Sequence, residues 1–279
     1  MSRRRDLQQR LGSLDEIEGI MVAMKNLAFM ETRKLAQFLS TQQRAVTSIE
    51  AAASDFASHY RHALPRPGSL SEVYLLIGSE RGFCGDFNES VAQEMFSRGD
   101  APPIVAVGRR LEPILSQNPA LLELVEGPSA TEEVAPVLTG LADRLAEIER
   151  NLRPGTVLGL TVFYHSDETG GVRARRLLPL PEPKPPGRAF SHPPLLNLAP
   201  TDFFAGLTEH YLYAALHEAF YSSLMVENRY RLDHMENAIR QLDKRVSRLK
   251  LAYNTMRQEE IIEEIEVIML SVEALGKQP

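Results

Sequence analysis

The chain has 279 residues, 37 acidic against 31 basic side chains and a formal net charge of −6 at pH 7. This length allows one or two domains, and the mild acidity argues against nucleic acid as a main partner. The single cysteine, Cys84, excludes an internal disulfide and fits a reducing compartment. The sequence has no run of about 18 apolar residues and no secretory or transit signal, so we expect a soluble, cytosolic chain.

The first segment, residues 1–64, is predicted to be a long coiled-coil helix. It contains no proline, and its apolar residues recur at steps of three and four, as an amphipathic helix requires. Gly12 and Gly19 each cost about 1 kcal/mol inside a helix, so we expect looser first turns. The stripe consists of Leu7, Leu11, Leu14, Ile17, Met21, Met24 and Ala28.

The middle segment, residues 71–178, changes to the pattern of a small α/β domain. Short apolar runs end at Gly78 and Gly108 and predict buried strands at 73–77 and 104–107. Further strands are expected at 121–125, 156–164 and 172–178, the last two joined by a turn-rich segment. A helical stripe starts near Val134, and Ser129 with Glu132 has the spacing of a capping box. Strands that alternate with helices predict a Rossmann-like, mostly parallel sheet that ends in an antiparallel hairpin.

Residues 179–200 contain eight prolines and are predicted to be an extended connector. A recognition site for a proline-binding domain is the alternative.

The last segment, residues 201–279, mirrors the first. Its helical seam lasts more than three heptads, and at about 1.5 Å per residue the helix would be roughly 110 Å long. Neither stripe can be buried alone, so we expect the two helices to pair antiparallel as a rod with the α/β domain inserted between them. The seam consists of Leu232, Met235, Ile239, Leu242, Val246, Leu249, Tyr253 and Met256.

The sequence offers little catalytic chemistry. No phosphate-binding loop occurs, and the glycines that follow Gly78 do not match the dinucleotide spacing. Cys84 is weighed as a nucleophile, but the nearest histidines, His59 and His62, lie in the first helix, so a small buried thiol in a tight turn is preferred. His165 and Asp167 are expected in a solvent-exposed hairpin turn. We therefore predict no catalytic, cofactor or metal site.

The charges of the last helix change sign along its length. A basic stretch includes Arg229, Arg231 and Arg257, and an acidic stretch follows at 259–273. The acidic residues are interpreted as a charged helix surface rather than a metal site. The sign change predicts partners of complementary charge at different heights, and a solubilising surface is equally consistent.

The end of the last helix carries the strongest indication of a partner. If Tyr60 pairs near Ala205, the start of the chain lies near Glu264, and about a dozen residues remain unpaired. Their apolar side chains cover most of the circumference, so they must be enclosed by a fold-back or by another protein. These side chains are Ile265, Val267, Ile268, Met269, Leu270, Val272 and Leu275.

Several motifs resemble the gamma subunit of F-type ATP synthases, and the resemblance spans the whole chain. Ile20, Ala23 and Met24 resemble the family's I-T-K-A-M near the start. The turn after Gly78 resembles the family's S-[DE]-R-G-L-C-G-x-x-N through Ser79, Glu80, Arg81, Gly82, Phe83, Cys84, Gly85 and Asn88. The segment 253–258 resembles Y-N-x-x-R-Q, and the signature that follows is represented by Ile261 and Glu264.

The resemblance implies a non-catalytic central-stalk rotor without a cofactor. Its helix pair would turn inside a ring of alpha and beta subunits and couple ion flow to ATP synthesis or hydrolysis there. Its foot would join the epsilon subunit and the c-subunit ring, peripheral to the cytoplasmic face of a bacterial inner membrane. The residues expected to contact the ring are Met24, Arg257, Gln258, Ile261, Glu264 and Ile268. The rim turn would comprise Arg81, Gly82, Cys84, Gly85 and Asn88.

Several positions depart from the family pattern. Val22 stands in place of a lysine, Asp86 replaces a common glycine, and four positions of the C-terminal signature differ: Ile262, Val267, Ser271 and Val272. These departures indicate a divergent member, and one hypothesis is a gamma subunit of a second, sodium-type rotary ATPase. A freestanding α/β enzyme that uses Cys84 and a static coiled-coil tether are the alternative functions.

Overall fold

The computed structural model describes residues 2–64, 68–99, 102–180 and 192–275. They form two compact units, one of residues 1–27 with 232–279 and the other of residues 28–231. Two long helices, α1 (Ser2–His59) and α5 (Pro200–Leu275), each contribute residues to both units. The predicted boundaries at 64, 71, 178 and 200 follow the elements rather than these units, and as domain boundaries they stay predictions.

The larger unit contains a five-stranded sheet in the order β3-β2-β1-β4-β5. The strands are β1 (Ser69–Ile77), β2 (Ile104–Val107), β3 (Leu121–Val125), β4 (Thr156–Ser166) and β5 (Gly171–Leu178). All neighbours pair parallel except β4 and β5, which form an antiparallel hairpin. The predicted parallel sheet with a terminal hairpin is therefore confirmed.

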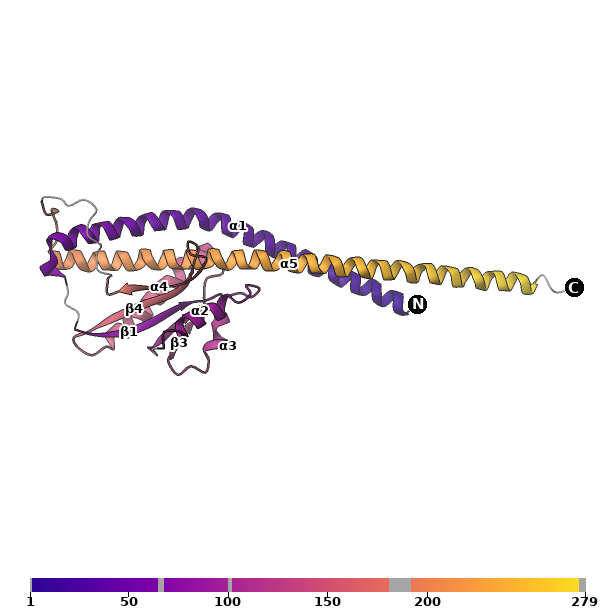
Figure 1. The fold of residues 1–279 in the computed structure, drawn as a ribbon, viewed down its shortest axis with the longest axis horizontal. Coiled ribbons are helices and arrows are strands. Elements are labelled where there is room, and N and C mark those ends of the chain that lie inside the picture. The colour runs from indigo at the N-terminus through magenta and orange to yellow at the C-terminus, as the bar shows by residue number, and fades with distance from the viewer. Residues whose placement is uncertain (1, 65–67, 100–101, 181–191, 276–279) are drawn as a thin grey trace. The chain divides into compact units, whose positions relative to one another are not determined.

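Each face of the sheet is covered by helices, because side chains alternate along every strand. Tyr74 and Leu76 of β1 pack with α2 (Phe87–Phe96) and with α3 (Glu112–Leu115), which follows the short helix η2 (Arg109–Leu111). Val73, Leu75 and Ile77 face the opposite way and share a core with α4 (Val134–Arg150) and parts of α1 and α5. The arrangement is a doubly wound layer that uses the two long helices as part of its cover (Figure 1).

The two long helices pair antiparallel in each unit. In the larger unit, the side-chain amide of Gln42 donates to the carbonyl of Ala214 at 3.1 Å, and Phe56 stacks on Phe203 with ring centroids 5.2 Å apart. In the smaller unit, Arg4 pairs with Glu260 at 2.9 Å and Lys25 with Glu236 at 3.7 Å. Within each unit, residues with higher numbers on α1 pair with residues of lower number on α5, which confirms the predicted antiparallel direction.

The predicted seam of α5 is also the buried stripe of the smaller unit. Met235 and Val246 are buried, and the other predicted seam residues between Leu232 and Met256 are half-buried. On α1, the matching stripe is half-buried at most positions, although Ile17 is exposed. The helix runs through Gly12 and Gly19 without interruption.

The capping contact before α4 comes from Glu133, whose carboxylate accepts from the backbone N–H of Ser129 at 2.6 Å, whereas the predicted Glu132 pairs with Lys34. A short helix, η3 (Thr131–Glu133), shifts the start of α4 by a turn and explains the difference. Of the proline-rich connector, residues 181–191 lie outside the described residues, and 192–199 form neither helix nor strand.

The helix ends nearest the connector are held by an aromatic cluster around Phe56. This side chain is 1% exposed and stacks on Tyr60, Phe203 and Phe204. The change Phe56→Ala should lower the free energy of unfolding by about 3–5 kcal/mol, because it leaves a cavity among aromatic rings. Urea denaturation of the purified chain measures this loss. The matched change Phe29→Ala, at an exposed position of α1, should cost less than about 1 kcal/mol.

Candidate functional site

The glycine-rich turn between β1 and α2 is built around a buried polar network. Asn88 accepts from the backbone N–H of Ser79 and donates to its hydroxyl, both at 2.9 Å. The Ser79 hydroxyl also lies 3.1 Å from the Cys84 sulfur. Gly85 has a φ of 60°, a conformation that glycine adopts without strain. The predicted tight turn with a small buried thiol is confirmed.

Arg231 of α5 connects this turn to the helix. The guanidinium donates to the Gly82 carbonyl at 3.4 Å and to the Asn228 side-chain oxygen at 2.9 Å, and it forms an ion pair with Glu227. Arg231, Glu227 and Asn228 are all buried. Arg231 therefore does not belong to the exposed basic stretch in which the sequence pattern placed it.

A second contact between the turn and α5 is aromatic. Phe87 is buried with Cys84 and Val226, and Tyr230 packs against them. His165 of β4 stacks on Phe87 with ring centroids 3.9 Å apart, and its Nε2 lies 2.8 Å from the Phe87 carbonyl. The prediction that His165 faces solvent is wrong, because β4 extends to Ser166 and directs the imidazole into this cluster.

Cys84 is poorly suited to nucleophilic chemistry. Its side chain is buried, and burial raises the pKa of the thiol above its usual value, partly offset by the hydrogen bond to Ser79. A nucleophilic cysteine needs the reverse, a lowered pKa and some exposure. The proposed histidine partners lie elsewhere, His59 at the end of α1 and His62 in the short helix η1 (Arg61–Ala63).

Glu227 lies where the turn meets α5, and its carboxyl group has a strongly shifted pKa. Burial raises its pKa to about 7, although the Arg231 guanidinium opposes the shift. A carboxylate taken from water into a packed helix face loses hydration that one ion pair replaces only in part. Glu227 was not among the predicted site residues. The signal available for it was a glutamate with an arginine four residues later, directly after a long apolar stretch of α5.

The predicted rim residues fall into two groups. Arg81 and Gly85 are exposed and Gly82 is half-buried, whereas Cys84 and Asn88 are buried and shape the turn. The predicted ring contacts lie elsewhere, on the smaller unit. Arg257, Gln258, Ile261, Glu264 and Ile268 are exposed on α5, and Met24 is half-buried on α1. Whether these residues contact a partner stays a prediction.

The last described turns of α5 expose an apolar surface, here called the apolar tip and defined as residues 261–272. Every residue of the tip is exposed. Its large apolar side chains are between 44% and 67% exposed, which is unusual for contiguous apolar surface on a soluble protein. These side chains are Ile261, Ile262, Ile265, Val267, Ile268, Met269, Leu270 and Val272.

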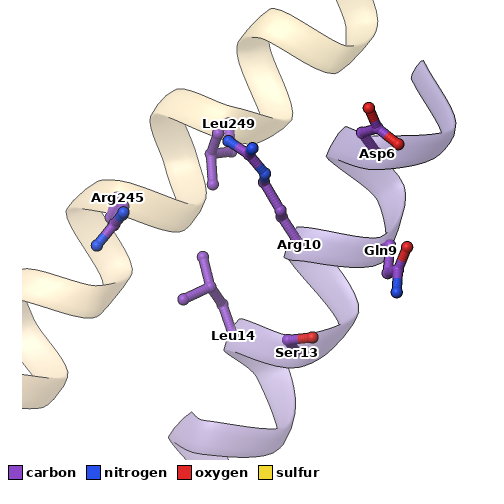
Figure 2. A pocket seen from close by; sticks show the side chains of 7 residues that line it. All are labelled: Asp6, Gln9, Arg10, Ser13, Leu14, Arg245 and Leu249. Carbon is purple, nitrogen blue, oxygen red and sulfur yellow. The ribbon is translucent and has the colours of Figure 1, made fainter. Parts of the chain in front are cut away.

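The helix pair of the smaller unit also has an open groove, shown in Figure 2. Leu14 of α1 points into the space between the helices, and Arg10 reaches toward Leu249 of α5. Arg245 of α5 and Asp6, Gln9 and Ser13 of α1 complete the lining. The groove shows that the seam is loosely filled near the start of α1.

In the part of the chain that the structure describes, no helix is long and apolar enough to cross a membrane. Among the residues of that part, no group of three or more histidine, cysteine or acidic side chains has the arrangement of a metal site.

Comparisons with known proteins agree along the whole chain. A family model described as ATP synthase matches residues 3–275. The ATP synthase gamma chain of Pelotomaculum thermopropionicum is 25% identical, over 97% of this chain and 98% of the relative. The ATP synthase gamma chain of a Methylobacterium species is 24% identical, over 97% of this chain and 99% of the relative.

Solved structures share the fold. The rotor of the mitochondrial ATP synthase of Euglena gracilis aligns with a TM-score of 0.62 at 15% identity, over 93% of this chain and 99% of that chain. A chain in the structure of the central stalk and c ring of the Tetrahymena thermophila mitochondrial ATP synthase aligns with a TM-score of 0.57 at 18% identity. The alignment covers 78% of this chain and 99% of that chain.

The raised pKa of Glu227 predicts a pH-dependent stability. Between about pH 4.5 and about pH 7 the native carboxyl holds a proton that the unfolded chain has lost. The free energy of unfolding should therefore fall as pH rises through this window, by at most about 3 kcal/mol, and level off above it. The change Glu227→Gln should remove this component, and urea denaturation at about pH 5 and about pH 8 measures it.

The exposed substitution Glu236→Gln on the same helix serves as the control and should keep the pH profile of the unchanged chain. Parallel profiles for the unchanged chain and Glu227→Gln would refute the assignment.

The environment of Cys84 predicts slow alkylation. At neutral pH, iodoacetamide should modify the native thiol at least about tenfold more slowly than the same thiol in the urea-unfolded chain, because both burial and the raised pKa suppress the thiolate. Mass spectrometry follows the reaction. Equal rates in the two states would restore Cys84 as a candidate nucleophile.

Proposed function

Because this chain belongs to the gamma subunits of the F-type ATP synthases, we propose that it is the central-stalk rotor of such an enzyme. The apolar tip carries the proposal. A helix that is apolar on nearly every side is stable in water only when something encloses it. Residues 261–272 are exposed, so no described part of the chain encloses them, and the enclosing surface is proposed to come from another protein.

The enclosing partner is proposed to be the ring of alpha and beta subunits. Apolar contact is non-directional, so an apolar tip in an apolar sleeve can turn without breaking a fixed set of hydrogen bonds. A static tether would gain more from directional polar contacts, which fix one orientation. The composition of the tip therefore favours a rotor over a tether.

Charges next to the tip extend the proposed interface. Arg257 and Gln258 are exposed immediately before it, and an acidic stretch that includes Glu264 overlaps it. We assign Arg257 and Gln258 to a beta-subunit loop, where the Arg257 charge would meet a complementary charge. Met24, Ile261, Glu264 and Ile268 are assigned to contacts with the alpha/beta ring. Arg81 and Gly85, the exposed residues of the rim turn, are assigned to the lower edge of the ring.

The remaining partners follow from the same proposal. The α/β domain with the adjoining parts of α1 and α5 would form the foot that joins the epsilon subunit and the c-subunit ring. The chain itself would be non-catalytic, and the catalytic sites would lie in the ring. In a bacterium the complex would hold it at the cytoplasmic face of the inner membrane. A divergent, sodium-type enzyme is included in this proposal.

Removal of the tip tests the proposal. A chain that ends at Met256, expressed with its partner subunits, should form less complex and should transport fewer ions for each ATP hydrolysed, because the sheathed segment is lost. Subunit content and the transport ratio in membrane vesicles are the measurements. Unchanged coupled activity would contradict the proposed role.

Two controls sharpen this test. A chain that ends at Leu275 keeps the tip and should behave as the full chain does. A covalent cross-link between the tip and a beta subunit should stop ATP hydrolysis if the chain rotates, whereas hydrolysis that continues would indicate a tether.

A further inference from the structure

Arg175 of the edge strand β5 lies between the sheet and both long helices. Its guanidinium donates to Glu218 of α5 at 2.8 Å and to Glu50 of α1 at 2.9 Å. A third bond reaches the Tyr211 hydroxyl of α5 at 3.2 Å, and the guanidinium also lies over that ring, 5.8 Å from its centroid. One side chain of the sheet thus contacts both helices at the same place.

The contact is largely screened from water. The Arg175 side chain is 15% exposed and that of Glu218 is 13% exposed, whereas Glu50 lies at the edge. Loss of one partner in such a buried pair leaves an uncompensated charge and is strongly unfavourable. A planar guanidinium also fixes the angle between its acceptors, which an ammonium group does not.

The other arginines of the strand do not share this position. Arg176 points to the other face of the sheet, where it pairs with Glu72 of β1 at 2.6 Å and is 50% exposed. Arg173 lies 3.8 Å from Glu168 in the adjoining turn. Arg176 therefore provides a matched comparison, because it is the same residue type with a carboxylate partner, and within the described part of the chain it has no hydrogen bond to a helix.

We propose that Arg175 is a positioning residue that fixes the sheet to both long helices and so transmits torque from the sheet to these helices. This inference rests on the proposed rotor function. The interdigitated apolar core between sheet and helices already resists separation and sliding. The hydrogen bonds of Arg175 to Glu50, Glu218 and Tyr211 add a directional restraint at the sheet edge.

The test uses the intact ATP synthase complex in inverted membrane vesicles, with Arg175→Met compared with Arg176→Met. ATP hydrolysis, ion transport (both lumen acidification and sodium uptake) and subunit content are measured together. Arg175→Met should lower the ions transported for each ATP by about threefold or more at unchanged subunit content, within the range that interface mutations change coupling. Arg176→Met should keep the ratio of the unchanged complex.

Hydrogen exchange adds a direct readout of the joint. Backbone amides in peptides that span residues 171–178 should exchange about tenfold faster in the Arg175→Met complex and at the normal rate in the Arg176→Met complex. Arg175→Lys keeps a charge but not the planar fork, so its transport ratio should lie between those of the unchanged complex and Arg175→Met. This variant also provides the measurement if Arg175→Met fails to assemble.

Two results would overturn the inference. Faster exchange with an unchanged transport ratio would reduce Arg175 to a structural residue. An unchanged chain that joins no ATP-hydrolysing complex would refute the proposed function and this inference with it, and the two failures are distinguished by the complex that carries no substitution.

Discussion

The structure depends on the burial of two apolar helix stripes. The antiparallel pairing of α1 and α5 buries one stripe against the other. The helices differ in length, with 58 residues in α1 and 76 in α5. Near the start of α1, Arg4 still pairs with Glu260 of α5. The apolar residues that follow, up to Val272, are exposed, so no described residue of the chain covers them. The need for an external sleeve follows from that difference in length.

Features that depend on local periodicity could be predicted from the sequence. The seam from Leu232 to Met256 and the strands at 104–107 and 121–125 were predictable because a helix or strand repeats every few residues. The parallel sheet followed from the alternation of strands and helices. The apolar tip was predictable for the same reason. The length of the apolar stripe in α5 could be compared with the length of α1, and the stripe in α5 is the longer one.

Features that depend on distant pairs could not be predicted in this way. Arg231 contacts Gly82 across a sequence separation of 149 residues, and Arg175 contacts Glu50 across 125. Charge alone placed Arg231 on the surface, and turn composition placed His165 in solvent. Both are buried because the rim turn packs onto α5, which brings apolar and aromatic side chains over them. In folded proteins generally, arginine is mostly exposed and histidine is intermediate in burial.

The distribution of polar contacts fits a machine part that is rigid in one region and slides in another. The larger unit fixes its sheet to the helices through buried, directional contacts such as those of Arg175 and Arg231. The apolar tip presents the opposite surface, one that gains from enclosure whatever its rotational position. Buried ion pairs add little net stability compared with apolar packing, but they define geometry. Among the described residues, the buried ion pairs of Arg175 and Arg231 lie in the larger unit, where torque transmission requires a fixed geometry.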